Sequence, residues 1–197
     1  MRVLDLGCGP GSDLSVWGVN AIDEITGLDI DRKSLKIAKE RFPDRTYVLC
    51  RGECLPFKEA SFERVISGVA LPYMSIQRSL SESYRTLVPS GRLSMSLHPP
   101  SFTMYELIHN ALPKPIPTLF RLYVMANGLL FHCTGKTAGF IRGRTESFQT
   151  ERGMRIAMDR AGFTDLSFRR GTGPVGETLL VEATKRKSLT DAHDPDL

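Results

Sequence analysis

The stretch from Val3 to Asp13 reads VLDLGCGPGSD and combines a short apolar run with a turn that contains three glycines. The apolar residues before Gly7 are typical of a buried strand that ends at that glycine. Glycine accepts a positive φ and carries no side chain, so a ligand can lie directly against the backbone of such a turn. The stretch therefore predicts a buried strand followed by a ligand-binding turn.

Strands and helices are expected to alternate along the chain around this turn. The apolar patterns predict further strands at 24–30, 46–50, 62–70, 92–97, 164–170 and 177–183, and helices at 12–18, 32–42, 76–87 and 150–162. The segment VPSG, residues 88–91, is expected to link a helix to the following strand. Alternation of this kind over the first hundred residues is typical of a doubly wound parallel sheet of the α/β class.

We expect one domain over residues 1–184 and a flexible tail over residues 185–197. Residues 98–147 break the alternation with five prolines and the apolar stretch LFRLYVMANGLLF. An insertion after the carboxyl end of a strand commonly covers a binding crevice, so we expect this one on the substrate side. The alternative is a surface helix pair packed on the sheet.

Composition excludes several classes of function. Hydrophobic residues make up 41% of the 197 residues and the net charge is +4, with no basic stripe, so no nucleic-acid partner is expected. The four cysteines, Cys8, Cys50, Cys54 and Cys133, form no CxxC pair, and no Cys or His pair has the spacing of zinc ligands. No apolar run is long enough for a membrane span and no signal peptide is evident, so we expect a cytoplasmic protein without a metal.

The glycine spacing narrows the choice of ligand. A dinucleotide fingerprint needs G-x-G-x-x-G, whereas here the spacing is G-x-G-x-G and Ser12 stands where the third glycine should be. Asp5 before the turn would repel a pyrophosphate but attract a cation. Asp29, 18 residues beyond Gly11 at the end of the second strand, suits a carboxylate that accepts hydrogen bonds from ribose hydroxyls. A ribose, a close backbone approach and a cationic tail together indicate S-adenosylmethionine.

Four segments in order, VLDLGCGPGSD, GLDID, GECLPFKEASFERVISG and LVPSGRL, resemble the motifs of class I S-adenosylmethionine-dependent methyltransferases, and most closely the branch called methyltransferase type 11. The resemblance covers Arg2 to Leu97 well and the final helix and hairpin loosely. It implies a Rossmann-like seven-stranded sheet of order 3-2-1-4-5-7-6, with the last strand antiparallel and a helical insertion after strand 5. It also implies S-adenosyl-L-methionine as the cofactor and a small molecule as the methyl acceptor.

The resemblance also implies a set of cofactor-binding residues. Many family members carry Asp at the position of Arg51, so Glu53 is the nearest acid for the adenine amino group, with the backbone around Cys54 facing the ring edge. Ser67 and Gly68 correspond to the methionine end. The full expected set is Asp5, Gly7, Cys8, Gly9, Gly11, Asp29, Ile30, Glu53, Cys54, Leu55, Ser67 and Gly68.

Each of these assignments has a purely structural alternative. Asp5 would then order the turn by accepting backbone N–H groups. Asp29 would cap the following helix, although Asp31 is better placed for that role. Cys8 would be a small filler beside the turn.

The family provides no universal catalytic residue, because methyl transfer mainly needs the acceptor placed in line with the S–CH3 bond. The candidates are His98, which follows the fifth strand, and Tyr73, which follows the fourth. Their alternatives are a turn histidine and a packing tyrosine. His109 and His132 in the insertion are weaker candidates. The apolar insertion suggests a hydrophobic acceptor, although membrane-surface contact and ordinary core packing explain it equally well.

Family members normally carry one or two helices before the first strand, whereas here the strand begins at Arg2. Either the start codon is assigned too late or the cofactor lies open to solvent. The second possibility favours a rival interpretation, a degenerate module that binds S-adenosylmethionine without catalysis. A nicotinamide-dependent oxidoreductase is a third interpretation, which the glycine spacing disfavours. The sequence gives no indication of the oligomeric state.

Overall fold

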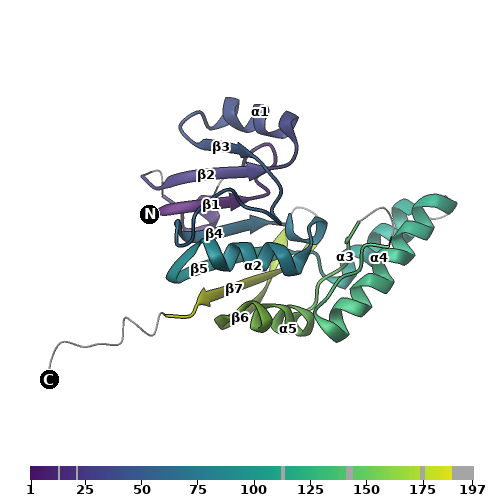
Figure 1. Cartoon of the computed structure of the whole chain (residues 1–197). Helices are drawn as coiled ribbons and strands as arrows, with labels where there is room; N and C mark the ends of the chain where they lie inside the picture. Colours follow the sequence, from purple (N-terminus) through teal and green to yellow (C-terminus); the bar gives the residue numbers. More distant parts are fainter. Residues whose placement is uncertain (13, 21, 112–113, 141–143, 174–175, 188–197) are drawn as a thin grey trace, which may run out of the picture.

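A seven-stranded sheet forms the centre of the molecule in the computed structural model, which describes all residues except 13, 21, 112–113, 141–143, 174–175 and 188–197 (Figure 1). The strands are β1 (Arg2–Leu6), β2 (Glu24–Asp29), β3 (Thr46–Leu49), β4 (Phe62–Gly68), β5 (Leu87–Leu97), β6 (Phe163–Gly173) and β7 (Gly176–Lys185). Their order is β3-β2-β1-β4-β5-β7-β6. Only β7 runs antiparallel to its neighbours, so the expected topology is confirmed.

The described part of the chain holds five α-helices, which are α1 (Arg32–Arg41), α2 (Ile76–Thr86), α3 (Pro100–Glu106), α4 (Pro115–Thr134) and α5 (Glu151–Ala161). Short 3-10 turns lie at Ser15–Trp17 and Leu71–Tyr73, and a π-helical turn at Leu107–Ala111 follows α3. The helix ends follow from the local sequence. The Asp31 carboxylate accepts the first free N–H groups of α1, and Thr150 does the same for α5.

The hydrophobic core lies on both faces of the central strands. On one face, Leu4 and Leu6 of β1 pack in a cluster with Leu80 of α2 and Met158 of α5. On the other face a smaller cluster joins Val3, Leu14, Val19 and Ile66. Because the central strands alternate between these two buried faces, β1, β4 and β5 hold the carboxyl edge of the sheet rigidly in place.

The structure corrects the sequence-based expectations in three places. The segment VPSG belongs to β5, which starts at Leu87 because this residue already pairs with Phe62 of β4. The helix expected at 12–18 is only a 3-10 turn, ended by Gly18 in the left-handed conformation. The last two strands are longer than expected.

The insertion folds into two helices that stand beyond the carboxyl ends of the strands. In Figure 1, α3 and α4 lie to the right of the arrowheads of β1 and β4. α4 packs on α5, where the fully buried Phe131 lies against Gly153. In the structure the helices of the insertion thus lie at the carboxyl edge of the sheet, with α4 packed on α5.

Candidate active site

The glycine turn after β1 is tied to the end of β2. Gly7, Gly9 and Gly11 all have positive φ, at 74°, 52° and 85°. The N–H groups of Gly7 and Cys8 both donate to the carbonyl oxygen of Leu28, at 2.7 and 3.0 Å. These bonds fix the turn at the carboxyl edge of the two central strands, where ligands bind in open α/β sheets.

The three glycines serve different purposes. A Cβ atom on Gly7 would overlap the Cβ of Ala70, and one on Gly11 would lie 2.9 Å from the Phe42 ring. A Cβ atom on Gly9 would have no heavy atom within 4 Å. Gly7 and Gly11 are thus required by packing, whereas Gly9 leaves open space above its backbone.

Asp29 joins the turn to the start of α1. Its Oδ2 atom accepts the N–H of Gly9 at 2.8 Å, and its Oδ1 atom accepts the N–H of Asp31 at 2.8 Å. The cap of α1 comes from Asp31 instead, so the alternative role for Asp29 is wrong. Each carboxylate oxygen has a second lone pair, so Asp29 can still accept hydrogen bonds from a ligand.

A cavity of about 240 Å³ lies beside Asp29 at the carboxyl ends of β1, β2 and β3. Four of the residues that were predicted to bind the cofactor line this cavity, and these are Gly7, Asp29, Ile30 and Glu53. The rest of its lining consists of Cys50, Arg51, Gly52, Ala70, Tyr73 and Met74. The open space at Gly9, the acceptor capacity of Asp29 and the exposed side chain of Ile30 fit a nucleoside that carries a ribose and a flat ring.

The chain that leaves β4 narrows this cavity. Val69 has a φ of 60°, which is rare for a β-branched residue, and its N–H donates to the Ser96 carbonyl at 3.0 Å. The chain then passes over the glycine turn, and Met74 lies against both Gly7 and Gly52. The size of the cavity therefore depends on the position of the Met74 side chain.

Glu53 holds the loop after β3 against the start of α2. Its Oε1 atom accepts the N–H of Ser75 at 3.0 Å, and its Oε2 atom lies 3.6 Å from Nε of Arg51. Its side chain is 15% exposed. Glu53 thus reaches the cavity wall, but its carboxylate already has a structural partner there.

The other predicted residues lie outside the cavity lining. Cys54 and Gly68 are exposed, while Leu55 and Ser67 are buried, and Leu55 is part of the main core. Leu55 also donates its N–H to Glu82 at 2.7 Å. The structure therefore brings Gly7, Asp29, Ile30 and Glu53 to one cavity, whereas these four residues, like Gly9 and Gly11, lie outside its lining.

Asp5 and Cys8 lie behind the turn and are both buried. Burial raises the pKa of Asp5 to about 7, with Arg45 opposing and Asp29 adding to the shift. One carboxylate oxygen of Asp5 has no hydrogen-bond partner. Burial raises the pKa of Cys8 to about 12, which supports its role as an unreactive filler.

The two catalytic candidates lie together next to this cavity. The His98 ring stacks on Phe102 with a centroid distance of 3.9 Å and meets the edge of Tyr73 at 6.3 Å. A small hollow of about 20 Å³ borders these rings together with Arg121 and Glu146. Tyr73 lines both hollows, so it separates the cofactor side from the side facing the insertion.

Burial, more than the nearby charges, favours the neutral form of His98. Burial lowers the pKa of His98, Arg121 lowers it further, and Glu106 opposes the shift. Arg121 forms an ion pair with Glu106 at 2.8 Å. Burial raises the pKa of Glu146 and of the Tyr73 hydroxyl, so the phenol stays protonated and can donate a hydrogen bond.

Sequence reasoning missed Phe102, Arg121 and Glu146. A signal was present for the charged groups, since Glu106 and Glu146 are the only acids between residues 98 and 150. The other histidines of the insertion are elsewhere: His109 stacks on Tyr105, and His132 bonds to Thr150. Among the described residues no cluster of three or more potential ligands is placed to hold a metal ion.

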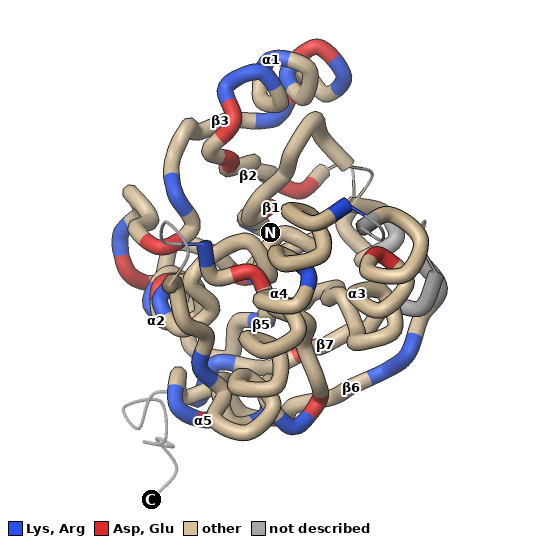
Figure 2. The backbone as a smooth tube through the Cα atoms, turned by 90° about the vertical axis from the view of Figure 1, so that its right-hand side faces the viewer, with Lys and Arg blue, Asp and Glu red and all other residues tan. Residues whose placement is uncertain are grey.

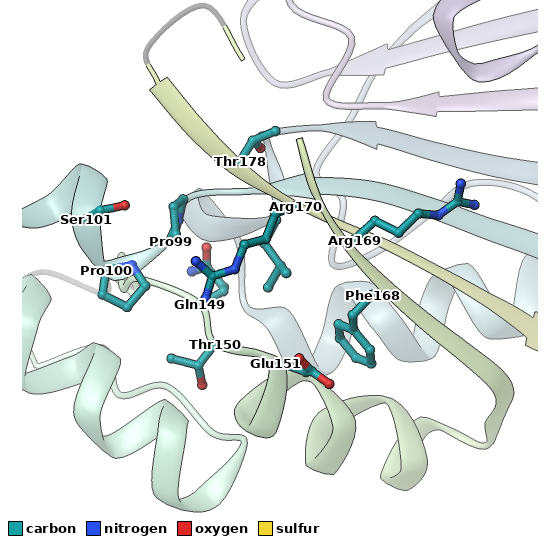
Figure 3. Close-up of a pocket in the computed structure, with 11 residues that line it drawn as sticks. Pro99, Pro100, Ser101, Gln149, Thr150, Glu151, Phe168, Arg169, Arg170 and Thr178 are labelled. Atoms are coloured by element: carbon teal, nitrogen blue, oxygen red, sulfur yellow. The ribbon is translucent and has the colours of Figure 1, made fainter. Parts of the chain in front are cut away.

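A third hollow, of about 370 Å³, lies between α3, α5 and the β6–β7 hairpin (Figure 3). Gln149, Arg169 and Thr178 are among its lining residues. It is larger than the cavity beside Asp29 but shares no lining residue with it. We place the candidate site at the glycine turn, because Gly7 of that turn, the Asp29 carboxylate and the Tyr73 ring border one cavity at the carboxyl ends of the strands.

Comparisons with known proteins show which proteins this chain resembles. Residues 4–95 match the family model described as "Methyltransferase domain". A malonyl-[acyl-carrier protein] O-methyltransferase of Enterobacter lignolyticus is 36% identical over 96 residues, which are 48% of this chain and 38% of that protein. A demethylmenaquinone methyltransferase of Staphylococcus haemolyticus is 26% identical over 197 residues, 96% of this chain and 78% of that protein.

The solved structures show the same fold. A putative S-adenosylmethionine-dependent methyltransferase from Listeria monocytogenes has a TM-score of 0.65 at 22% identity, covering 94% of this chain and 90% of that one. Residues 4–95 of this chain therefore resemble a methyltransferase domain, and the chain has the fold of S-adenosylmethionine-dependent methyltransferases. It spans between about a third and a half of the length of the first curated relatives that it matches.

Proposed function

We propose that this chain is an S-adenosylmethionine-dependent methyltransferase that acts on a small, hydrophobic acceptor. The observation that carries the proposal is that Tyr73 borders two neighbouring hollows. One hollow joins a glycine turn to Asp29, and the other lies among the rings of His98 and Phe102. A donor and an acceptor bound on either side of Tyr73 would face each other there.

Four residues would hold the cofactor. The Asp29 carboxylate would accept the ribose hydroxyls, the bare backbone at Gly9 would allow a close approach, and Ile30 would pack on the adenine ring. Glu53 would accept the adenine amino group only through its remaining lone pairs, since Ser75 occupies one of them. When bound, S-adenosylmethionine supplies an electrophilic methyl group on a sulfonium.

On the acceptor side the residues would orient the substrate and exclude water. The rings of Phe102 and His98 offer an apolar stacking surface, which is why we propose a hydrophobic acceptor. A neutral His98 has a free ring nitrogen that can take a proton from an acceptor hydroxyl, and Tyr73 can hold the acceptor through its own hydroxyl. His98 and Tyr73 therefore keep the roles proposed for them from the sequence.

The test combines binding with turnover. Titration calorimetry with S-adenosylmethionine should show uptake, and methyl release should then be followed on phenolic, quinol, carboxylate and amine acceptors. The proposal is supported if an aromatic acceptor is methylated and if His98→Gln lowers this turnover while the affinity for the cofactor stays unchanged. Binding without turnover on any acceptor favours the degenerate module, and thermal protection by NAD alone favours the oxidoreductase.

A further inference from the structure

The outer face of α4 is apolar along its whole length. One side of the helix is buried through Val124, Gly128 and Phe131, with Asn127 the only polar residue among the buried ones. The exposed residues are Pro115, Ile116, Pro117, Leu119, Leu122, Ala126, Leu129, Leu130 and Cys133. A helix on a protein surface normally presents charged and polar residues to solvent, whereas α4 presents apolar residues there.

The exposed fractions are large, at 82% for Ile116, 68% for Leu119 and 60% for Leu129. The patch continues on the neighbouring elements, where Met104 of α3 and Ile108 of the π-helical turn are also exposed. Figure 2 shows α3 and α4 side by side toward the viewer, with α4 tan over most of its length. Contiguous apolar surface of this kind marks an interaction site.

The charges between residues 107 and 145 are of one sign, whereas Glu106 of α3 pairs with Arg121. Between residues 107 and 145 the sequence holds five Lys or Arg residues and no Asp or Glu. Lys114 directly precedes α4 and Lys136 follows its end, and both are exposed. A lysine at the amino end of a helix opposes the helix dipole, so Lys114 does not stabilise the helix electrostatically.

From this arrangement we infer that the α4 face, defined by the exposed residues of α4 with Lys114 and Lys136, docks on an anionic lipid bilayer. An apolar strip flanked by lysines matches a surface of acyl chains beneath negative headgroups. Among the described residues no helix is long and apolar enough to cross a membrane, so α4 would lie in the interface plane. Docking would hold the hollow under α4, bordered by Arg121 and Val124, close to the bilayer.

A second copy of the chain fits the same surface less well. A symmetric dimer through α4 would bring equal lysines from both copies to one interface, with no acid in residues 107–145 to pair with them. An anionic bilayer instead provides the missing negative charge. The inference concerns binding alone and holds whether or not the chain turns over a substrate.

The experiment is co-sedimentation of the full chain with vesicles of phosphatidylcholine, and of phosphatidylcholine mixed equally with phosphatidylglycerol. We expect binding to the anionic vesicles that weakens as salt is added, because screening shortens the range of the lysine charges. The double variant Lys114→Gln/Lys136→Gln should bind about 30-fold more weakly, at about 1 kcal/mol per charge. Leu119→Gln/Leu129→Gln should lose at least about tenfold.

Matched controls lie on α1. Lys36→Gln/Lys39→Gln removes two exposed charges and Ile37→Gln one exposed apolar side chain, and both should bind vesicles as the wild type does. Circular dichroism should show unchanged folding in all variants. The inference is overturned if the controls lose as much binding as the α4 variants, or if anionic vesicles are not preferred. It is also overturned if light scattering shows a dimer that Leu119→Gln/Leu129→Gln dissociates while vesicles are not bound.

Discussion

The N–H of Gly9 donates to Oδ2 of Asp29 at 2.8 Å, so the acid that ends β2 also positions the turn that follows β1. Asp29→Ala should therefore weaken S-adenosylmethionine binding twice, through the lost ribose contact and the loosened turn. Hydrogen bonds to a charged group contribute about 1.5–3 kcal/mol, so we expect roughly 100-fold weaker binding by calorimetry. Asp31→Ala, which removes the α1 cap, should lower the thermal midpoint and leave affinity nearly unchanged. Equal affinity of Asp29→Ala and the wild type would contradict this account.

Gly7 and Gly9 should respond differently to alanine. Gly7→Ala places a methyl group into Ala70, so it should unfold the turn and lower the thermal midpoint clearly. Gly9→Ala meets no neighbour and should cost only the backbone strain of a positive φ, about 1 kcal/mol. Its added methyl group nevertheless occupies the open space, so S-adenosylmethionine should bind more weakly. A Gly9→Ala variant with wild-type affinity in calorimetry would show that no ligand approaches this backbone.

Asp5 should make the fold less stable as the pH rises. Its pKa is raised in the folded chain to about 7 from 3.8, so the folded state binds the proton more tightly than the unfolded state does. The stability from this group is complete below pH 3.8 and is lost as the pH rises to 7, by on the order of 4 kcal/mol. Asp5→Asn should remove this slope from urea unfolding curves measured across that range. The exposed Glu40→Gln should keep it.

Arg85 holds the loop that follows β3 in place. Its guanidinium donates to the carbonyl oxygens of Phe57 and Leu55 at 2.7 and 3.0 Å, and it pairs with Glu82 at 2.8 Å. Arg85→Ala should cost about 2 kcal/mol of unfolding free energy and speed hydrogen exchange in residues 52–57. The comparison is Arg155→Ala in an exposed pair, which should cost about 0.5 kcal/mol. Equal losses in the two variants would argue against a fastening role.

The positions of the strands and of Asp29 follow from local patterns in the sequence, whereas the strand order was expected from the family resemblance. The apolar runs mark the strands, and Asp29 stands at a fixed distance after the glycine turn. These features need no knowledge of distant contacts.

The parts that were missed depend on segments far apart in the chain. Arg121 and Glu146 meet His98 only because the insertion folds back over the carboxyl edge. VPSG looks like a turn, yet it extends β5 because Leu87 pairs with Phe62. The partners of Glu53 and Leu55 come from the α2 region, which local patterns cannot identify.

The positive φ of Val69 stores backbone strain directly before Ala70, which lines the cavity beside Asp29. A β-branched residue held there stores about 1–3 kcal/mol, which relaxation to an extended conformation would release. That release would offset the displacement of Met74 when a cofactor enters. In Val69→Gly this backbone strain is absent. The thermal midpoint of the protein without cofactor should therefore rise, and S-adenosylmethionine should bind more weakly. If both quantities stay at their wild-type values, cofactor binding does not use the backbone strain at Val69.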